Sequence, residues 1–193
     1  MAASAQKQVE TAKTQVSEIQ TQANTALSAA AAQAAVAQIH AAVEGGQPFA
    51  AAVKELGGAS GVTVPEALSA TAEAGVPTLA ALRASFPDAA HDAIRASIEA
   101  KAGDGILARS RAFLEAQIAT RSLTPREGSD VDAVLSRMED QLRQGNLAGV
   151  LDEAGKLPPD AAAAMSGWLD AARARNAAVE GMATLDATLP GTN

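Results

Sequence analysis

Apolar residues recur at helical spacing through the C-terminal third of the chain. Between residues 129 and 143 they stand at i, i+3, i+4, i+7 and i+11, namely Val131, Val134, Leu135, Met138 and Leu142. Two further stripes with this period cover residues 147–154 and 161–179. The pattern predicts three amphipathic helices. Because none of them can bury its stripe alone, we expect them to pack on one another or on a partner.

A second pattern marks the N-terminus, where residues 5–43 contain neither Gly nor Pro and predict one long helix. Its apolar positions alternate in steps of three and four, as in a coiled coil; they are Val9, Ala12, Val16, Ile19, Ala23, Ala26 and Ala30. We expect at least a dimer, whose interface combines this seam with the C-terminal helices through Val9, Val16, Ile19, Val131, Leu135, Met138, Leu142 and Trp168. The alternatives are an alanine-rich helix that docks on its own chain and a Trp168 that serves as a core anchor.

Gly and Pro divide the middle of the chain into short predicted helices. Gly45-Gly46 ends the long helix, and Pro48, Pro65 and Pro77 each open a short one, the last ending near Phe86-Pro87. Residues 56–64 form a Gly-rich connector. Two helices over 88–102 and 106–121 follow, and Ser129 is the expected N-cap of the first C-terminal helix.

The sequence therefore predicts an all-α chain in which a long N-terminal, Ala-rich, coiled-coil-like helix precedes short helices and a C-terminal bundle of three to four helices. About a quarter of the residues are Ala, which has the highest helix propensity but buries little apolar area. We expect five parts, which are the coiled-coil-like helix at 1–43, short helical pairs at 44–87, a basic amphipathic hairpin at 88–122, the C-terminal module at 123–187 and a frayed tail at 188–193.

Reactive side chains do not gather in any recognisable catalytic or ligand-binding motif. The chain has no Cys, and its two histidines, His40 and His91, are 51 positions apart and outside any metal-ligand spacing. The glycines at 57–61 lack the Lys-Ser/Thr pair of a phosphate-binding loop. A net charge of −7 disfavours nucleic acid. We therefore expect no enzyme, no cofactor, no metal and no small-molecule substrate.

The C-terminal stretch resembles the C-terminal domain of the mitofilin family. The resemblance rests on Gly145-Asn146-Leu147, Leu157-Pro158 and Trp168 in the context WLDAARAR, and extends upstream to residues 37–56 and 74–86, covering roughly 35–185. It implies a membrane-shaping scaffold on the periplasmic face of the bacterial inner membrane, which oligomerises, binds lipid before its C-terminal domain and contacts outer-membrane assembly proteins. The family's transmembrane anchor is not expected in this chain, because 23–43 is too polar to span a bilayer.

A basic island precedes the C-terminal module, since residues 95–126 carry six basic and three acidic side chains. On a helical wheel, apolar residues of 106–121 share one arc that is flanked by arginines. This arrangement is typical of a helix at an anionic membrane surface, and the candidate lipid-binding residues are Arg95, Lys101, Arg109, Arg111, Phe113, Leu114, Ile118 and Arg121. The alternative is a helix that caps the C-terminal module, in a helical adaptor or chaperone-like protein without lipid binding.

Overall fold

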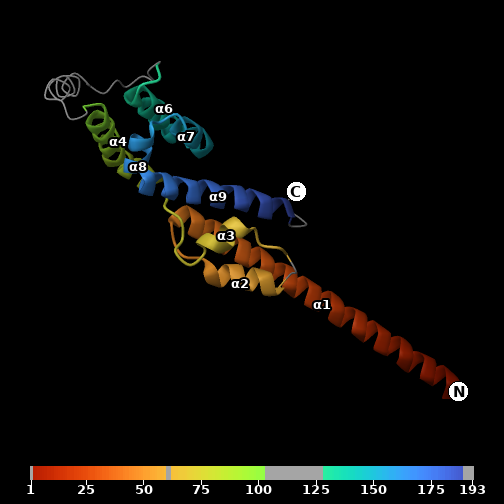
Figure 1. Ribbon diagram of the computed structural model, residues 1–193. Coiled ribbons are helices and arrows are strands. Elements are labelled where there is room, and N and C mark those ends of the chain that lie inside the picture. The colour runs from red at the N-terminus through yellow and green to blue at the C-terminus, as the bar shows by residue number, and fades with distance from the viewer. Residues whose placement is uncertain (1, 60–61, 103–127, 189–193) are drawn as a thin grey trace. The chain divides into compact units, whose positions relative to one another are not determined.

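The computed structural model describes residues 2–59, 62–102 and 128–188, with no side-chain description for residues 2–5, 59 and 102 (Figure 1). These residues form helices and connecting turns, and no strand is present among them. The helices are α1 (Ala2–Gly45), α2 (Ala50–Ala59), α3 (Glu66–Thr71), α4 (Leu79–Ala102), α6 (Val131–Gln144), α7 (Leu147–Ala154), α8 (Pro159–Ala164) and α9 (Ser166–Thr188). The all-α prediction, with its long N-terminal helix, is confirmed.

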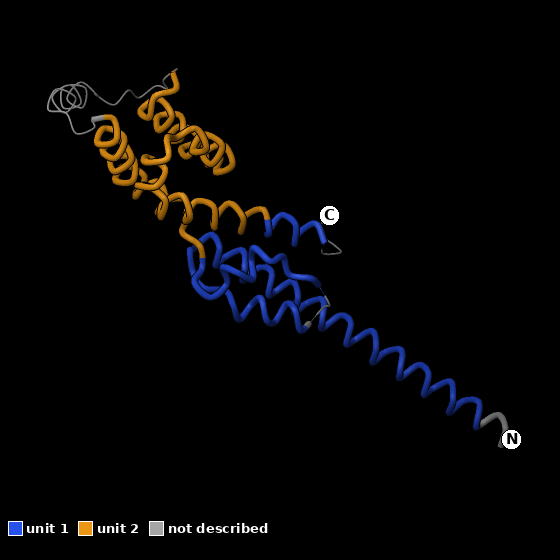
Figure 2. Tube along the Cα trace, in the orientation of Figure 1, with its two compact units in different colours: residues 1–75, 181–193 blue, residues 76–180 orange. Residues whose placement is uncertain are grey.

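The chain divides into two compact units, which are coloured in Figure 2. Unit 1 consists of Met1–Gly75 together with Gly181–Asn193, and unit 2 consists of Val76–Glu180. This division differs from the five consecutive parts expected from the sequence, because unit 1 is assembled from both ends of the chain. Helix α9 therefore contributes its first residues to unit 2 and its last residues to unit 1.

Unit 1 buries one face of the second half of α1. Helices α1 and α2 pack against each other, and α2 also contacts α3. The buried side chains include Ile39, Phe49, Leu56 and Leu68, and Leu185 of the returning segment is fully buried. Gly181 lies against Leu68, where an added Cβ would approach Leu68 Cγ to 3.1 Å. The end of α9 is therefore part of the unit 1 core.

Unit 2 packs α4, α6, α7, α8 and the first half of α9 around one apolar cluster. Phe86 and Trp168 meet edge to face in this cluster, with ring centroids 5.1 Å apart and an interplanar angle of 67°. Arg83 of α4 donates hydrogen bonds to the carbonyl oxygens of Leu142 and Arg143, at 3.0 and 2.7 Å. It thereby adds a donor to two carbonyls at the end of α6, of which that of Leu142 also accepts from the backbone N–H of Gly145 at 3.1 Å.

Several predicted boundaries are wrong. Helix α4 continues through Pro87, because Phe86 and Ala90 are buried on either side of it and their packing outweighs the roughly 3 kcal/mol cost of an internal proline. Gly57 and Gly58 lie inside α2. The cap of α6 is Asp130 and not Ser129, since Asp130 Oδ1 accepts from the backbone N–H of Ala133 at 2.8 Å.

The third C-terminal helix of the prediction is two helices. Met165 ends α8 with φ −106° and ψ 16°, outside the helical range, and α9 starts at Ser166. The buried side chain of Met165 holds this break inside the core of unit 2. Helix α9 then continues to Thr188, the first residue of the expected frayed tail, and the rest of that tail lies outside the described residues.

Candidate interaction surfaces

The first candidate surface is the apolar seam on the N-terminal half of α1. Every residue from 6 to 27 is exposed, and the seam residues Val9, Val16 and Ile19 have exposed fractions of 54%, 58% and 63%. Leu27 is a fourth large apolar side chain on this half, at 70%. A helix face with this many exposed branched side chains is the usual mark of an interaction surface.

The seam and the buried stripe of α1 lie on opposite faces of the same helix. The buried side chains of its second half include Ala32, Ile39 and Val43. At 100° per residue, the centre of this stripe is about 180° from the centre of the seam. The seam face continues through Ala30, Ala34, Ala37 and Ala41, which are all exposed. The core of unit 1 therefore leaves this face uncovered.

The C-terminal residues that we assigned to an interface lie instead within the chain's own core. Val131, Leu135, Met138, Leu142 and Trp168 are all buried in unit 2. Each faces α4 or a neighbouring helix of the unit, so in this structure they present no apolar stripe to a second copy. The core alternative for Trp168 is the one that the structure shows, with 8% of the residue exposed.

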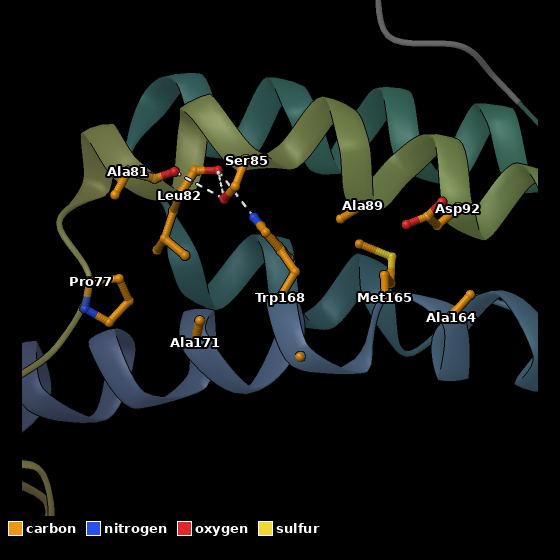
Figure 3. Close-up of a pocket in the computed structure, with 11 residues that line it drawn as sticks. Pro77, Ala81, Leu82, Ser85, Ala89, Asp92, Ala164, Met165, Trp168 and Ala171 are labelled. Carbon is orange, nitrogen blue, oxygen red and sulfur yellow. Dashed lines mark hydrogen bonds between the residues drawn. The ribbon is translucent and has the colours of Figure 1, made fainter. Parts of the chain in front are cut away.

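The second candidate surface is a groove of about 500 Å³ on unit 2, here called the α4/α9 groove. Figure 3 shows it between α4 and the α8–α9 segment, with Trp168 on one wall. The Trp168 indole N–H donates to the carbonyl of Leu82 at 3.1 Å. The groove is lined mainly by small side chains, and its one charged lining residue is Asp92. Sequence reasoning missed it because alanines give no hydrophobic period.

Most of the candidate lipid-binding residues lie outside the described part of the chain. These are Arg109, Arg111, Phe113, Leu114, Ile118 and Arg121. Arg95 and Lys101 are exposed on α4. Arg95 forms an exposed ion pair with Asp92 at 3.2 Å, which is weak enough for either side chain to take another partner.

One helix of the described residues, spanning Gln6–Gly45, is long and apolar enough to cross a membrane by length and composition. Its most apolar stretch reaches a mean hydropathy of 1.3, and 28% of that stretch is buried inside the chain. We expected the region to be too polar, but its many alanine methyl groups offset the few Gln, Asn and His side chains. The core helix of a soluble protein meets the same criterion.

A buried arginine, Arg175, and a half-buried one, Arg137, make contacts in unit 2 that the sequence did not reveal. Arg175, 4% exposed, donates to the carbonyl of Pro77 at 3.2 Å. Arg137 Nε donates to Glu153 Oε2 at 2.8 Å and thereby ties α6 to α7. Glu153 also accepts from Lys156 at 2.6 Å. The hydrogen bond from Lys156, followed by that from Arg137, lowers the pKa of Glu153 below its ordinary value of 4.5.

Further polar contacts of the described residues connect helices within a unit. His40 Nε2 lies 3.0 Å from Asp186 Oδ1, which connects α1 to the end of α9 within unit 1. Among the described residues, no group of three or more His, Cys, Asp or Glu side chains could hold a metal ion. No buried side-chain N or O atom of these residues lacks a hydrogen-bond partner.

Comparison with known proteins finds no match to a family model, to a curated protein or to a solved structure. The case for a function therefore rests on the two surfaces and on the sequence itself.

Proposed function

We propose that this protein is a helical scaffold that self-associates through α1 and organises a membrane surface. The observation that carries the proposal is the exposed seam with Val9, Val16 and Ile19, beside which Leu27 is exposed as well. A helix in a protein gains most of its stability from packing its apolar face and not from intrinsic helix propensity. A partner helix on the seam would bury the apolar side chains and stabilise the helix at the same time.

Charge favours a second copy of this chain as that partner. The whole chain carries −7, whereas residues 1–43 carry two lysines and two glutamates and are neutral. In the coiled-coil register the positions flanking the seam are mostly glutamines, such as Gln8, Gln15, Gln20 and Gln22. Two copies can therefore meet along α1 without the repulsion that the rest of the chain would produce.

The membrane role follows from the sequence. The resemblance to mitofilin and the basic island at 95–126 support contact with an anionic bilayer on the periplasmic face of a bacterial inner membrane. Arg95 and Lys101, exposed on α4, begin the island. An oligomer would present several such islands at once, so weak individual contacts would add to firm attachment.

Self-association is tested by sedimentation equilibrium at tens of micromolar. The parent chain is expected as a dimer or larger, and the double variant Val16→Glu/Ile19→Glu as the 19.3 kDa monomer. The matched control is Thr14→Glu/Thr21→Glu, which adds the same charge to exposed positions on the other side of the helix. A monomeric parent, or a control that dissociates as readily as the seam variant, would overturn the role of the seam.

Membrane contact is tested by flotation with anionic vesicles. The parent should float, raised salt should weaken binding, and Arg109→Glu/Arg111→Glu should abolish it. The second candidate function is a helical adaptor that does not bind lipid, which the α4/α9 groove favours because it offers room for a partner. A parent that associates but stays with the soluble fraction would establish the adaptor and exclude the membrane scaffold.

A further inference from the structure

We propose that the α4/α9 groove binds an amphipathic helix from a partner protein, with a Lys or Arg of that helix beside Asp92. This inference concerns unit 2 alone and does not depend on the self-association of α1 or on lipid binding. It rests on three properties of the groove, which are its shape, its hydrogen bonding and its charge.

The shape suits a helix laid lengthwise. On α4 the lining extends from Ala81 to Asp92, twelve residues or about 16 Å of helix. Small residues occupy the opposite wall, among them Gly167 and Ala171. Two neighbouring helices with small facing residues leave a channel into which the ridge of a third helix can pack closely. Gly167 is exposed, and an added Cβ there would meet no atom within 4 Å.

The polar groups in the groove already have partners. Figure 3 shows the Trp168 indole and the Ser85 hydroxyl directed to the backbone of α4. Trp168 Nε1 donates to Leu82 O, and Ser85 Oγ donates to Ala81 O at 3.0 Å. An apolar side chain that enters the groove would therefore leave neither group unsatisfied. This property separates the groove from a site built to recognise a polar small molecule.

Charge identifies the rest of the partner. Asp92, at one end of the groove, is the one charged side chain in its lining, and its exposed ion pair with Arg95 can exchange for another cation. The described residues of unit 2 carry eight basic and twelve acidic side chains, a net charge of −4. A basic flank on the bound helix would therefore find complementary charge, and an acidic flank would be repelled.

The experiment uses Trp168 as the reporter, because it is the single tryptophan of the chain and lines the groove. The probe is a synthetic, tryptophan-free amphipathic peptide of about five helical turns, with leucines on one face and lysines on its flanks. A matched peptide carries glutamates in place of the lysines. The lysine peptide should change the Trp168 emission saturably, and the glutamate peptide should bind at least about tenfold more weakly.

Gly167→Leu places a side chain in the groove from a Cβ position that meets no atom within 4 Å, and it should weaken binding of the lysine peptide at least about tenfold. The matched control is Gly57→Leu, a helical glycine of unit 1 that also has no neighbour within 4 Å; its binding should equal that of the parent. Circular dichroism confirms that both variants fold. Asp92→Asn should reduce the preference for lysine over glutamate flanks.

Three results would overturn the inference. The first is the absence of a saturable change with the lysine peptide, and the second is parent-like binding by a folded Gly167→Leu variant. The third is a change in Trp168 emission that is caused by anionic vesicles and by neither peptide, and that is absent from the Gly167→Leu variant. This last result would make the groove a lipid site.

Discussion

Trp168 is held at both ends of its indole. Its ring packs edge to face on Phe86, and its N–H donates to the carbonyl of Leu82. Both partners come from α4, some 80 residues earlier in the chain. The sequence left a core anchor open as the alternative to an interface role for Trp168, but it did not identify α4 as the helix that receives the ring.

Trp168→Ala should destabilise unit 2 by about 3–5 kcal/mol, the usual cost of removing a large buried aromatic. Urea unfolding followed by circular dichroism at 222 nm measures it. Trp168→Phe is the control, since it keeps a ring against Phe86 and should cost far less than the alanine variant. An unchanged midpoint for Trp168→Ala would mean that the indole does not support the core.

Glu153 makes the stability of unit 2 depend on pH. Its pKa is lower in the folded chain than its ordinary value of 4.5. Its contribution is therefore fully present above that ordinary value and is lost as the pH falls through the lowered folded pKa. Glu153→Gln should be less stable than the parent by about 1 kcal/mol at neutral pH. The difference should shrink in denaturation series carried to pH values below 4.5; a constant difference would contradict the assignment.

At the scale of elements, the sequence predicted helices well where Gly and Pro mark their ends. Helix α1 was expected over residues 5–43 and extends from Ala2 to Gly45. Prediction from sequence failed where tertiary packing overrides a local signal, as at Pro87 inside α4 and at Met165 between α8 and α9. The α4/α9 groove depends on which helices become neighbours, and no local pattern records that.

Replacement by alanine should lower the stability of unit 2 at one of its glycines and raise it at another. Gly145 ends α6 with φ +79°, and an added Cβ would lie 3.4 Å from Leu79 Cδ2. Gly145→Ala should therefore cost about 1 kcal/mol. Gly167 lies in α9, where an added Cβ would meet no atom within 4 Å. Gly167→Ala should therefore stabilise the folded chain by about 0.4–1 kcal/mol. Thermal unfolding checks both, and shifts of the same sign would refute the argument.

At the scale of the whole molecule, the defining feature is a unit built from both ends of the chain. Unit 1 needs α1, α2 and α3, but its core is completed by Met182 and Leu185 at the end of α9. Local sequence patterns describe neighbours along the chain, so they gave no sign of this long-range closure. Unit 2, in contrast, is a single continuous segment.

Deleting residues 181–193 should therefore loosen unit 1 selectively. The deletion removes two buried apolar side chains, each worth about 1.5–3 kcal/mol. Hydrogen exchange should show lost protection in α2 and α3 and unchanged protection in α6 and α7. Asp186→Asn is the control, because its exposed contact with His40 contributes little. Equal loss of protection in both units, or in neither, would contradict the division.

The split architecture of unit 1 also sets an order of events during synthesis. The ribosome completes Gly75 long before it reaches Gly181, a delay of roughly 5–20 s at about 5–20 residues per second. During that interval the nascent chain lacks Gly181, which lies against Leu68, and the buried side chains of Met182 and Leu185. Unit 2 can form before the end of α9 is translated, and this end then completes the core that α1, α2 and α3 began. The apolar face of residues 1–75 therefore stays exposed during this interval, which makes this segment a natural substrate for a chaperone that binds nascent chains.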